Sequence, residues 1–145
     1  MKDRRKLFVW EPINNIGNIL ELIQLNINQN YLLFEFEDEQ ENILTVKYNK
    51  RTKNGYNVLA FRYTDEFTRS DLAPLAEKAQ HDYFQEEMSG WSLYKMENSD
   101  FKDWFLKLNG IYEESEVKHY LYATHNHIYE VLSLNDPEVS MELKE

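Results

Sequence analysis

The residues best suited to chemistry are the histidines near the C-terminal end of the sequence. His125 and His127 stand one residue apart in T-H-N-H, and His119 and Glu130 lie close by. Imidazole and carboxylate groups are common zinc ligands, and a catalytic zinc needs three protein ligands. If residues 117–134 formed one unbroken strand, all three histidines would share a face, because side chains alternate along a strand. That arrangement would make the chain a His-dependent metalloenzyme.

A β-hairpin is the competing interpretation, and the residue pattern favours it. Val117–Thr124 and His127–Leu134 are both rich in strand-forming residues, and His125-Asn126 lies between them. Asn tolerates positive φ, so a tight turn fits there. One strand of roughly eighteen residues would far exceed the typical length of about five or six. We therefore predict that the histidines are turn and surface groups, and that the chain binds no metal or other cofactor.

Other catalytic patterns are missing from the sequence. It has no cysteine, no Gly-rich phosphate loop and no Gly-x-Ser-x-Gly elbow. Adjacent carboxylates occur at Glu86-Glu87 and Glu113-Glu114, in polar segments that favour exposure to water. A general acid needs a pKa raised by burial, which such segments do not provide. The sequence therefore predicts a protein that is not an enzyme.

The elements that must position these residues begin with strands. Apolar and polar residues alternate in Ile19–Ile27, in residues 31–38 and in residues 43–48. The residues predicted to share the buried face of the second and third strands are Leu32, Phe34, Phe36, Leu44, Val46 and Tyr48. Asn54-Gly55 is a strong hairpin signal, and residues 56–64 would supply the next strand. This pattern predicts an antiparallel meander with one face in water.

Two helices are predicted later in the chain. The first, Asp71–Glu87, requires Pro74 in its first turn. The second begins at Ser99 as its N-cap and ends at Asn109-Gly110. Their predicted apolar stripes are Leu72, Leu75, Ala76, Ala79 and Tyr83 in the first helix, and Phe101, Trp104, Phe105 and Leu108 in the second. Together the patterns predict a single α+β domain over residues 1–145, with an antiparallel sheet of about six strands packed against two helices.

Composition and charge narrow the choice of partners. The 145 residues are 42% hydrophobic, enough for one core. No window approaches the ~20 apolar residues of a membrane span, and the N-terminal apolar run is too short for a secretion signal, so we expect a cytoplasmic protein. Residues 1–53 carry 8 basic and 8 acidic side chains, whereas residues 54–145 carry 8 and 18. This negative field disfavours nucleic acid and anionic membranes and attracts basic protein surfaces.

One block of sequence resembles a known family. It runs from Gly90 to Val139 and contains G-W-S-L-Y-K-M-E-N-S-D-F-K-D-W-F, then G-I-Y-E, then K-H-Y-L-Y-A-T-x-N-x-I-Y-E-V-L-S. The block resembles small α+β proteins of Gram-positive bacteria, some of which serve as immunity proteins (antitoxins) for polymorphic toxins of the LXG type. The resemblance implies a chain that binds and neutralises a toxin domain, and it transfers no catalytic residue.

Charge density then gives a hypothesis for the binding surface. Many toxin domains of that kind act on nucleic acids or nucleotides and have basic clefts, which an acidic surface bearing tyrosine would fit. The residues predicted to contact the toxin are Asp82, Glu86, Glu87, Tyr112, Glu113, Glu114 and Glu116. The alternatives that stay open are a homo-oligomeric accessory protein, joined through strand edges or aromatic residues, and the metalloenzyme built on the histidines. The sequence leaves the oligomeric state open.

Overall fold

The strands form two antiparallel sheets in the computed structural model, which describes residues 3–52, 55, 57–86, 90–108 and 110–145. One sheet has the order β1-β6-β7-β8-β5, and the other has the order β2-β3-β4-β9. The strands are β1 (Lys6–Val9), β2 (Leu20–Ile27), β3 (Leu32–Asp38), β4 (Ile43–Tyr48), β5 (Ala60–Asp65), β6 (Leu93–Glu97), β7 (Lys118–Ala123), β8 (His127–Ser133) and β9 (Glu138–Glu142). The helices are α1 (Ala73–Phe84) and α2 (Asp100–Leu106), with short 3-10 turns η1 (Glu66–Thr68), η2 (Ser70–Leu72) and η3 (Glu114–Glu116).

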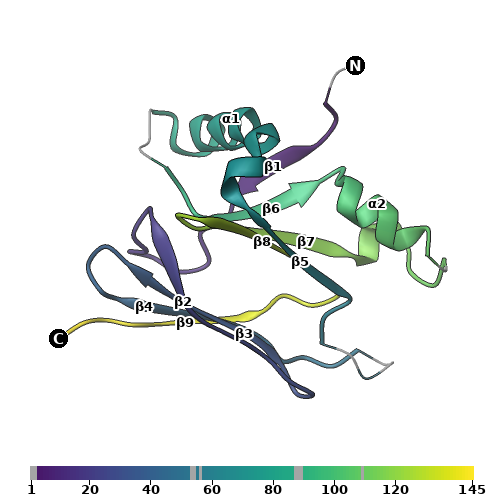
Figure 1. The fold of residues 1–145 in the computed structure, drawn as a ribbon, viewed down its shortest axis with the longest axis horizontal. Coiled ribbons are helices and arrows are strands. Elements are labelled where there is room, and N and C mark those ends of the chain that lie inside the picture. The colour runs from purple at the N-terminus through teal and green to yellow at the C-terminus, as the bar shows by residue number, and fades with distance from the viewer. Residues whose placement is uncertain (1–2, 53–54, 56, 87–89, 109) are drawn as a thin grey trace.

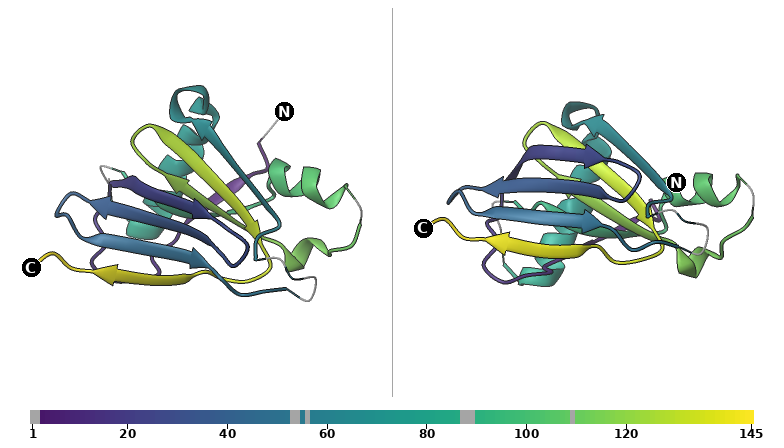
Figure 2. Two further views of the ribbon diagram at one scale, coloured as in Figure 1. Left: turned by 60° about the horizontal axis from the view of Figure 1, so that its bottom comes forward. Right: turned by 90° about the horizontal axis from the view of Figure 1, so that it is seen from below.

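The elements are arranged in three layers. Figure 1 shows α1 and α2 on one side of the β1-β6-β7-β8-β5 sheet and the β2-β3-β4-β9 sheet on the other. The five-stranded sheet is therefore covered on both faces, whereas the four-stranded sheet keeps one face open to water (Figure 2). Antiparallel sheets tolerate this because their alternating side chains can be apolar inside and polar outside.

Alternating apolar and polar residues form β2, β3 and β4 of the four-stranded sheet, as the sequence predicts. β3 pairs with β4 so that Phe34 lies opposite Val46 and Phe36 opposite Leu44. These four side chains are at most 1% exposed, while the residues between them are only partly buried. The pairing of β2, β3 and β4 in sequence is the predicted meander, and its inward side chains form half of the core.

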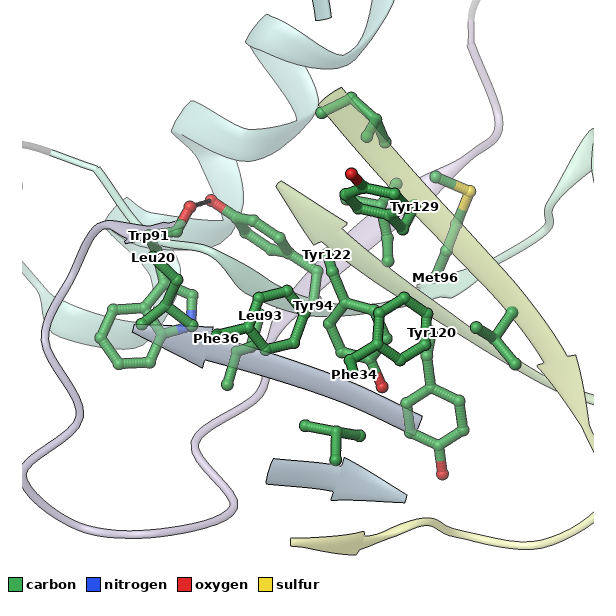
Figure 3. Packing of buried hydrophobic residues seen from close by; sticks show 14 of the residues in the cluster. Leu20, Phe34, Phe36, Trp91, Leu93, Tyr94, Met96, Tyr120, Tyr122 and Tyr129 are labelled. Carbon is green, nitrogen blue, oxygen red and sulfur yellow. Dashed lines mark hydrogen bonds between the residues drawn. The ribbon is translucent and has the colours of Figure 1, made fainter. Parts of the chain in front are cut away.

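Aromatic rings join the two sheets. Phe34 is fully buried. The centre of its ring lies 5.1 Å from the ring centre of Tyr122, 5.8 Å from that of Tyr129 and 6.1 Å from that of Phe61. Figure 3 shows the rings of Phe34, Tyr122 and Tyr129 meeting between the layers. The hydroxyl groups of Tyr48 and Tyr122 hydrogen-bond to each other in this core. Burial raises the pKa of both hydroxyls, so each stays neutral and keeps its hydrogen bond.

The α+β class is confirmed, but the number and grouping of the strands differ from the prediction. Strands β1 and β9 were not expected, because each is short and flanked by charged or turn-forming residues. The predicted hairpin between β4 and the following strand is also wrong: β4 pairs with β3 and β9, while β5 pairs with β8 in the other sheet. Asn54 of the expected turn lies outside the described residues. Strand alternation is a local signal, and it does not specify which sheet a strand joins.

Both helices are shorter than predicted, because α1 spans Ala73–Phe84 and α2 ends at Leu106, before the expected Asn109-Gly110. Ser99 caps α2 by accepting a hydrogen bond from the Lys102 amide at 3.0 Å, and Pro74 lies in the first turn of α1. Of the second predicted stripe, however, Trp104 in α2 and Leu108 just after it are more than half exposed, whereas Lys102 is buried. The reason is that the ammonium group of Lys102 donates to the carbonyl of Val117 at 2.8 Å, which turns this side of the helix inward.

The aromatic junction leads to a stability prediction. Replacing Phe34 by Ala removes a fully buried ring and leaves a cavity between the sheets, which typically costs about 3–5 kcal/mol. The free energy of unfolding measured in urea is expected to fall by that amount. Phe67→Ala is the matched control, because the same side chain is 91% exposed there. Equal losses in the two variants would contradict a core centred on Phe34.

Candidate functional site

The acidic residues predicted at the end of α1 lie on an exposed surface. Asp82 and Glu86 are exposed, and Glu87 lies outside the described residues. The Asp82 carboxylate accepts a hydrogen bond from the Lys78 ammonium at 2.9 Å, which lowers the pKa of Asp82. The negative charge of Asp82 is therefore already offset by Lys78 within α1.

The remaining predicted residues lie between α2 and β7. Glu113, Glu114 and Glu116 are exposed, and Glu113 and Glu116 cap the short helix η3 through reciprocal hydrogen bonds. Glu114 pairs with the Lys102 ammonium at 3.0 Å. The Tyr112 ring is partly buried and stacks on Phe105, with the ring centres 6.1 Å apart. These side chains shape their own loop as well as facing water.

The structure does not bring the two predicted groups together. The C-terminal end of α1 and the segment that follows α2 lie at opposite ends of the long axis in Figure 1, and the view from below in Figure 2 agrees. The six of these residues that the structure describes therefore do not form one continuous patch. Charge density along the sequence identified exposed carboxylates correctly but gave no information about their separation in space.

The hairpin interpretation of the T-H-N-H stretch is confirmed. β7 and β8 pair antiparallel, and the Thr124 amide donates to the His127 carbonyl at 2.9 Å across the turn. His125 is exposed at the tip, as predicted. His127 lies against the rings of Tyr63 and Tyr129 on the side of the sheet that faces β2-β3-β4-β9.

His119 departs from the prediction, because it is buried rather than on the surface. It shares the helix side of the sheet with Glu130, so the β7–β8 alternation places it on the face opposite to His127. Within the part of the chain that the structure describes, no group of three or more His, Asp or Glu side chains could hold a metal ion. Of the four residues proposed for a metalloenzyme, His119 and Glu130 meet, whereas His125 is exposed at the turn and His127 lies on the other face of the sheet.

A buried hydrogen-bonded series links α2 to the five-stranded sheet. Nδ1 of His119 lies 2.6 Å from Oγ of Ser99, and its Nε2 lies 3.0 Å from Oε1 of Glu130. The other carboxylate oxygen of Glu130 accepts from Arg62 Nε at 2.6 Å and from Arg69 Nη1 at 2.9 Å. Burial by itself raises the pKa of Glu130, but the hydrogen bonds from His119 and Arg62 outweigh it and lower this pKa to about 2.

The protonation pattern of this series follows from the ionised carboxylate. Because ionised Glu130 can only accept, Nε2 of His119 donates to it, while Nδ1 of the same ring faces the Ser99 hydroxyl. This order of hydroxyl, imidazole and carboxylate occurs in acyl-transfer enzymes. Here all three side chains are at most 2% exposed, and Ser99 already caps α2. A substrate has no access to the hydroxyl, so the Ser99–His119–Glu130 series serves to fix α2 on the sheet.

Sequence reasoning missed this series although it noticed each member. Ser99 was predicted as a helix cap, and His119 and Glu130 were considered as metal ligands. The missing information was that α2 folds back onto β7, a contact between segments twenty residues apart along the chain. An ionisable pair placed on the apolar side of two strands was the available signal, since buried charges need partners.

A second acidic surface covers the open side of the four-stranded sheet. Register places Glu21 of β2 directly opposite Glu37 of β3, while Glu35 faces Gln24 on one side and Thr45 on the other. We call this surface the acidic sheet face, and its carboxylates are Glu21, Glu35, Glu37, Glu138 and Glu142. All residues of these four strands are described, and Lys47 is the only cation among them. The right panel of Figure 2 shows this face uncovered.

The acidic sheet face was missed because charge was summed over long segments. Residues 1–53 have no net charge, since basic residues before β1 and after β4 balance the glutamates. Of the eight basic residues in this range, Lys47 alone belongs to the strands β2, β3, β4 and β9, all of whose residues are described. The usable signal was positional: in L-E-L and F-E-F-E-D each glutamate alternates with a buried apolar residue, which sends it to the water side.

A pocket of about 630 Å³ lies on the helix side of the five-stranded sheet, between α1 and the β7–β8 turn. Its lining is mostly apolar and includes Leu72, Trp91 and Leu121. Arg69 and Gln80 also reach it, but Arg69 pairs with Glu130 and Asp71, and Gln80 donates to the Tyr94 hydroxyl at 2.8 Å. The pocket therefore presents apolar surface, with these polar groups committed to the protein itself.

The chain matches no family model, no curated protein and no solved structure. Among the described residues, none of the helices is long and apolar enough to cross a membrane. The assignment of function therefore depends on the surfaces and networks described above.

The buried carboxylate leads to a second stability prediction. Glu130→Gln leaves Arg69 and His119 without their ionised partner inside the protein, and breaking a buried pair typically costs about 3–5 kcal/mol. The free energy of unfolding in urea is expected to fall by that amount at neutral pH. Asp82→Asn, which removes an exposed pair, should leave it unchanged. A Glu130→Gln variant as stable as the wild type would contradict a structural role for the network.

The same network gives stability a defined pH dependence. The pKa of Glu130 is about 2 in the folded protein and near its ordinary value of 4.5 in the unfolded chain, so folding favours the ionised form. Its stabilisation is fully present above the unfolded pKa and is lost as pH falls through the folded pKa. The difference in unfolding free energy between wild type and Glu130→Gln should be constant above about pH 6 and shrink from about pH 5 to 2. A difference that does not vary with pH would contradict this pKa.

Proposed function

We propose that this chain is an immunity protein that binds a basic toxin domain and neutralises it by occupying it. The toxin class that fits is one acting on nucleic acids or nucleotides, because its substrate site must carry positive charge. In this proposal the chain works by shape and negative potential and catalyses no reaction. The family resemblance of residues 90–139 points the same way.

The observation that carries the proposal is the composition of the acidic sheet face. Two glutamates, Glu21 and Glu37, stand directly opposite each other on neighbouring strands. Like charges in this position destabilise a sheet, on the scale of about 0.2–1 kcal/mol per pair. A face built for water alone has no need of that arrangement, whereas a cationic partner would convert the repulsion into attraction.

Long-range electrostatics support the same role. The formal net charge of −10 creates a field that attracts a basic protein before contact. Steering of this kind raises association rates by roughly 10–10³-fold and weakens as salt is added. Rapid capture suits a protein that must neutralise a toxin before it acts.

The buried network supports a binding role rather than a catalytic one. The only described series that resembles catalytic machinery, Ser99–His119–Glu130, is sealed inside the protein and holds α2 in place. Five carboxylates in contact with water lie together on the acidic sheet face, where they are suited to pair with cations of another protein.

The test partner is a basic toxin domain, to be sought in the reading frames that neighbour the one encoding this chain. The variant Glu21→Gln, Glu35→Gln and Glu37→Gln is expected to bind that domain at least tenfold more weakly in titration calorimetry, with a flatter dependence on salt, because three carboxylates are lost. Cells that express the toxin should then lose protection.

The matched control removes the same number of charges elsewhere, through Asp82→Asn, Glu86→Gln and Glu116→Gln. It should bind and protect like the wild type. If this control loses binding while the sheet variant keeps it, the interface is the surface predicted from charge density and not the sheet face. If the wild type neither binds nor protects, the immunity function itself is wrong.

A further inference from the structure

Strand β2 has one free edge. On one side it pairs with β3 over its whole length. On the other side, within the described part of the chain, its only backbone partner is Thr124, which forms an isolated bridge with Leu20. The N–H and C=O groups on the outer side of residues 21–27 are therefore left for another strand to pair with.

The other sheet edges carry features that discourage pairing. β9 follows Pro137 and contains Glu138 and Glu142, and β5 contains Arg62 and ends at Asp65. β1 spans only four residues and begins with Lys6. Charges, proline and short length are the usual means by which proteins protect exposed edges. Glu21 is the only charged residue in the eight of β2.

The two sides of this edge differ in chemistry. On the core side, Leu22 and Leu25 are partly buried, and Ile27 is 61% exposed at the border of the sheet. Ile23 is 49% exposed at the β-bulge between Leu22 and Gln24. An incoming strand would therefore meet aliphatic side chains on its core side.

On the water side the same strand would meet carboxylates. A side chain opposite Glu21 has Glu37 immediately behind it, and one opposite Gln24 has Glu35 behind it. Direct and diagonal neighbours on a sheet face lie about 5–8 Å apart, within reach of Lys and Arg side chains. Charge complementarity thus selects cations on this side of the added strand.

We propose that the basic partner adds a strand to the free edge of β2, with Lys or Arg side chains over the acidic sheet face and aliphatic side chains toward the core. This inference rests on the proposed function and names how the same face is engaged. Backbone hydrogen bonds give such an interaction its register, and the alternating side chains give it selectivity. The bulge at Ile23 limits regular pairing to Gln24–Ile27 on one side of it and to Glu21 and Leu22 on the other.

A peptide probe tests the mode of binding without the toxin. The probe is an eight-residue peptide that alternates lysine and valine, added to the full chain at low salt. Hydrogen exchange measured by NMR is expected to slow at backbone amides of residues 21–27. Two control peptides retain the charge. One has the same composition with lysines and valines segregated, so that a strand cannot place lysines on one side and valines on the other; the other has every backbone amide methylated, so that it cannot donate backbone hydrogen bonds. Both should bind at least tenfold more weakly.

Variants at one position supply the matched control. Asn26 lies on the water side of β2, opposite Leu33. Asn26→Lys should weaken binding of the lysine-valine peptide severalfold, and Asn26→Glu should retain or strengthen it. The order should reverse for a peptide that alternates glutamate and valine. Circular dichroism and unfolding in urea establish that both variants fold.

Three results would overturn the inference. Equal binding of the three lysine peptides would mean that charge alone holds them on the face. Slowed hydrogen exchange confined to β3, β4 and β9 would also mean that charge alone holds the peptides on the face. Slow exchange at β2 that increases with protein concentration, without peptide, would assign the edge to a second copy of the chain. In each case the charge variants of the sheet face still decide the immunity proposal separately, through binding and protection with the toxin domain.

Discussion

The packing of aromatic rings between the two sheets is the constraint on which the other features depend. Because Phe34, Phe36 and Tyr122 must face inward to fill this layer, every second residue of β3 must face water. The sequence uses those outward positions for Glu35 and Glu37. The acidic sheet face is thus fixed by the same alternation that builds the core, and a one-residue slip of register would bury the glutamates and expose the rings.

The second organising feature is a charge that the protein keeps inside. Glu130 is fully buried and ionised, and it holds Arg62 and Arg69 on one oxygen and His119 on the other side. Through these contacts and the Ser99–His119 hydrogen bond, β5, β7, β8, the turn between η1 and η2, and the start of α2 are fixed relative to one another. Residue types associated with catalysis here have an architectural role, since a buried charge is stable only with its partners in place.

Local patterns in the sequence predicted the local structure well. The α+β class, the β2-β3-β4 meander, the Ser99 cap and the β7–β8 hairpin all follow from alternation, capping and turn chemistry within a few residues. Features that depend on contacts between distant segments were not predictable in this way. The addition of β9 beside β4, the pairing of β5 with β8 and the burial of His119 next to Ser99 each join segments whose proximity no local pattern specifies. The binding surface predicted from charge density differs from the acidic sheet face for the same reason. A run of charged residues in the sequence does not specify which residues lie beside it in the folded protein.

The opposed glutamates of β2 and β3 link folding and binding through ionic strength. At about 0.1 M salt the Debye length is about 10 Å, so repulsion between exposed charges across neighbouring strands is already reduced, and more salt reduces it further. Added salt therefore stabilises the unbound protein. The same ions screen the attraction between this face and a cationic surface. Higher ionic strength thus favours folding of the unbound protein and disfavours formation of its complex. The isolated molecule is most stable under the conditions in which its complex is weakest.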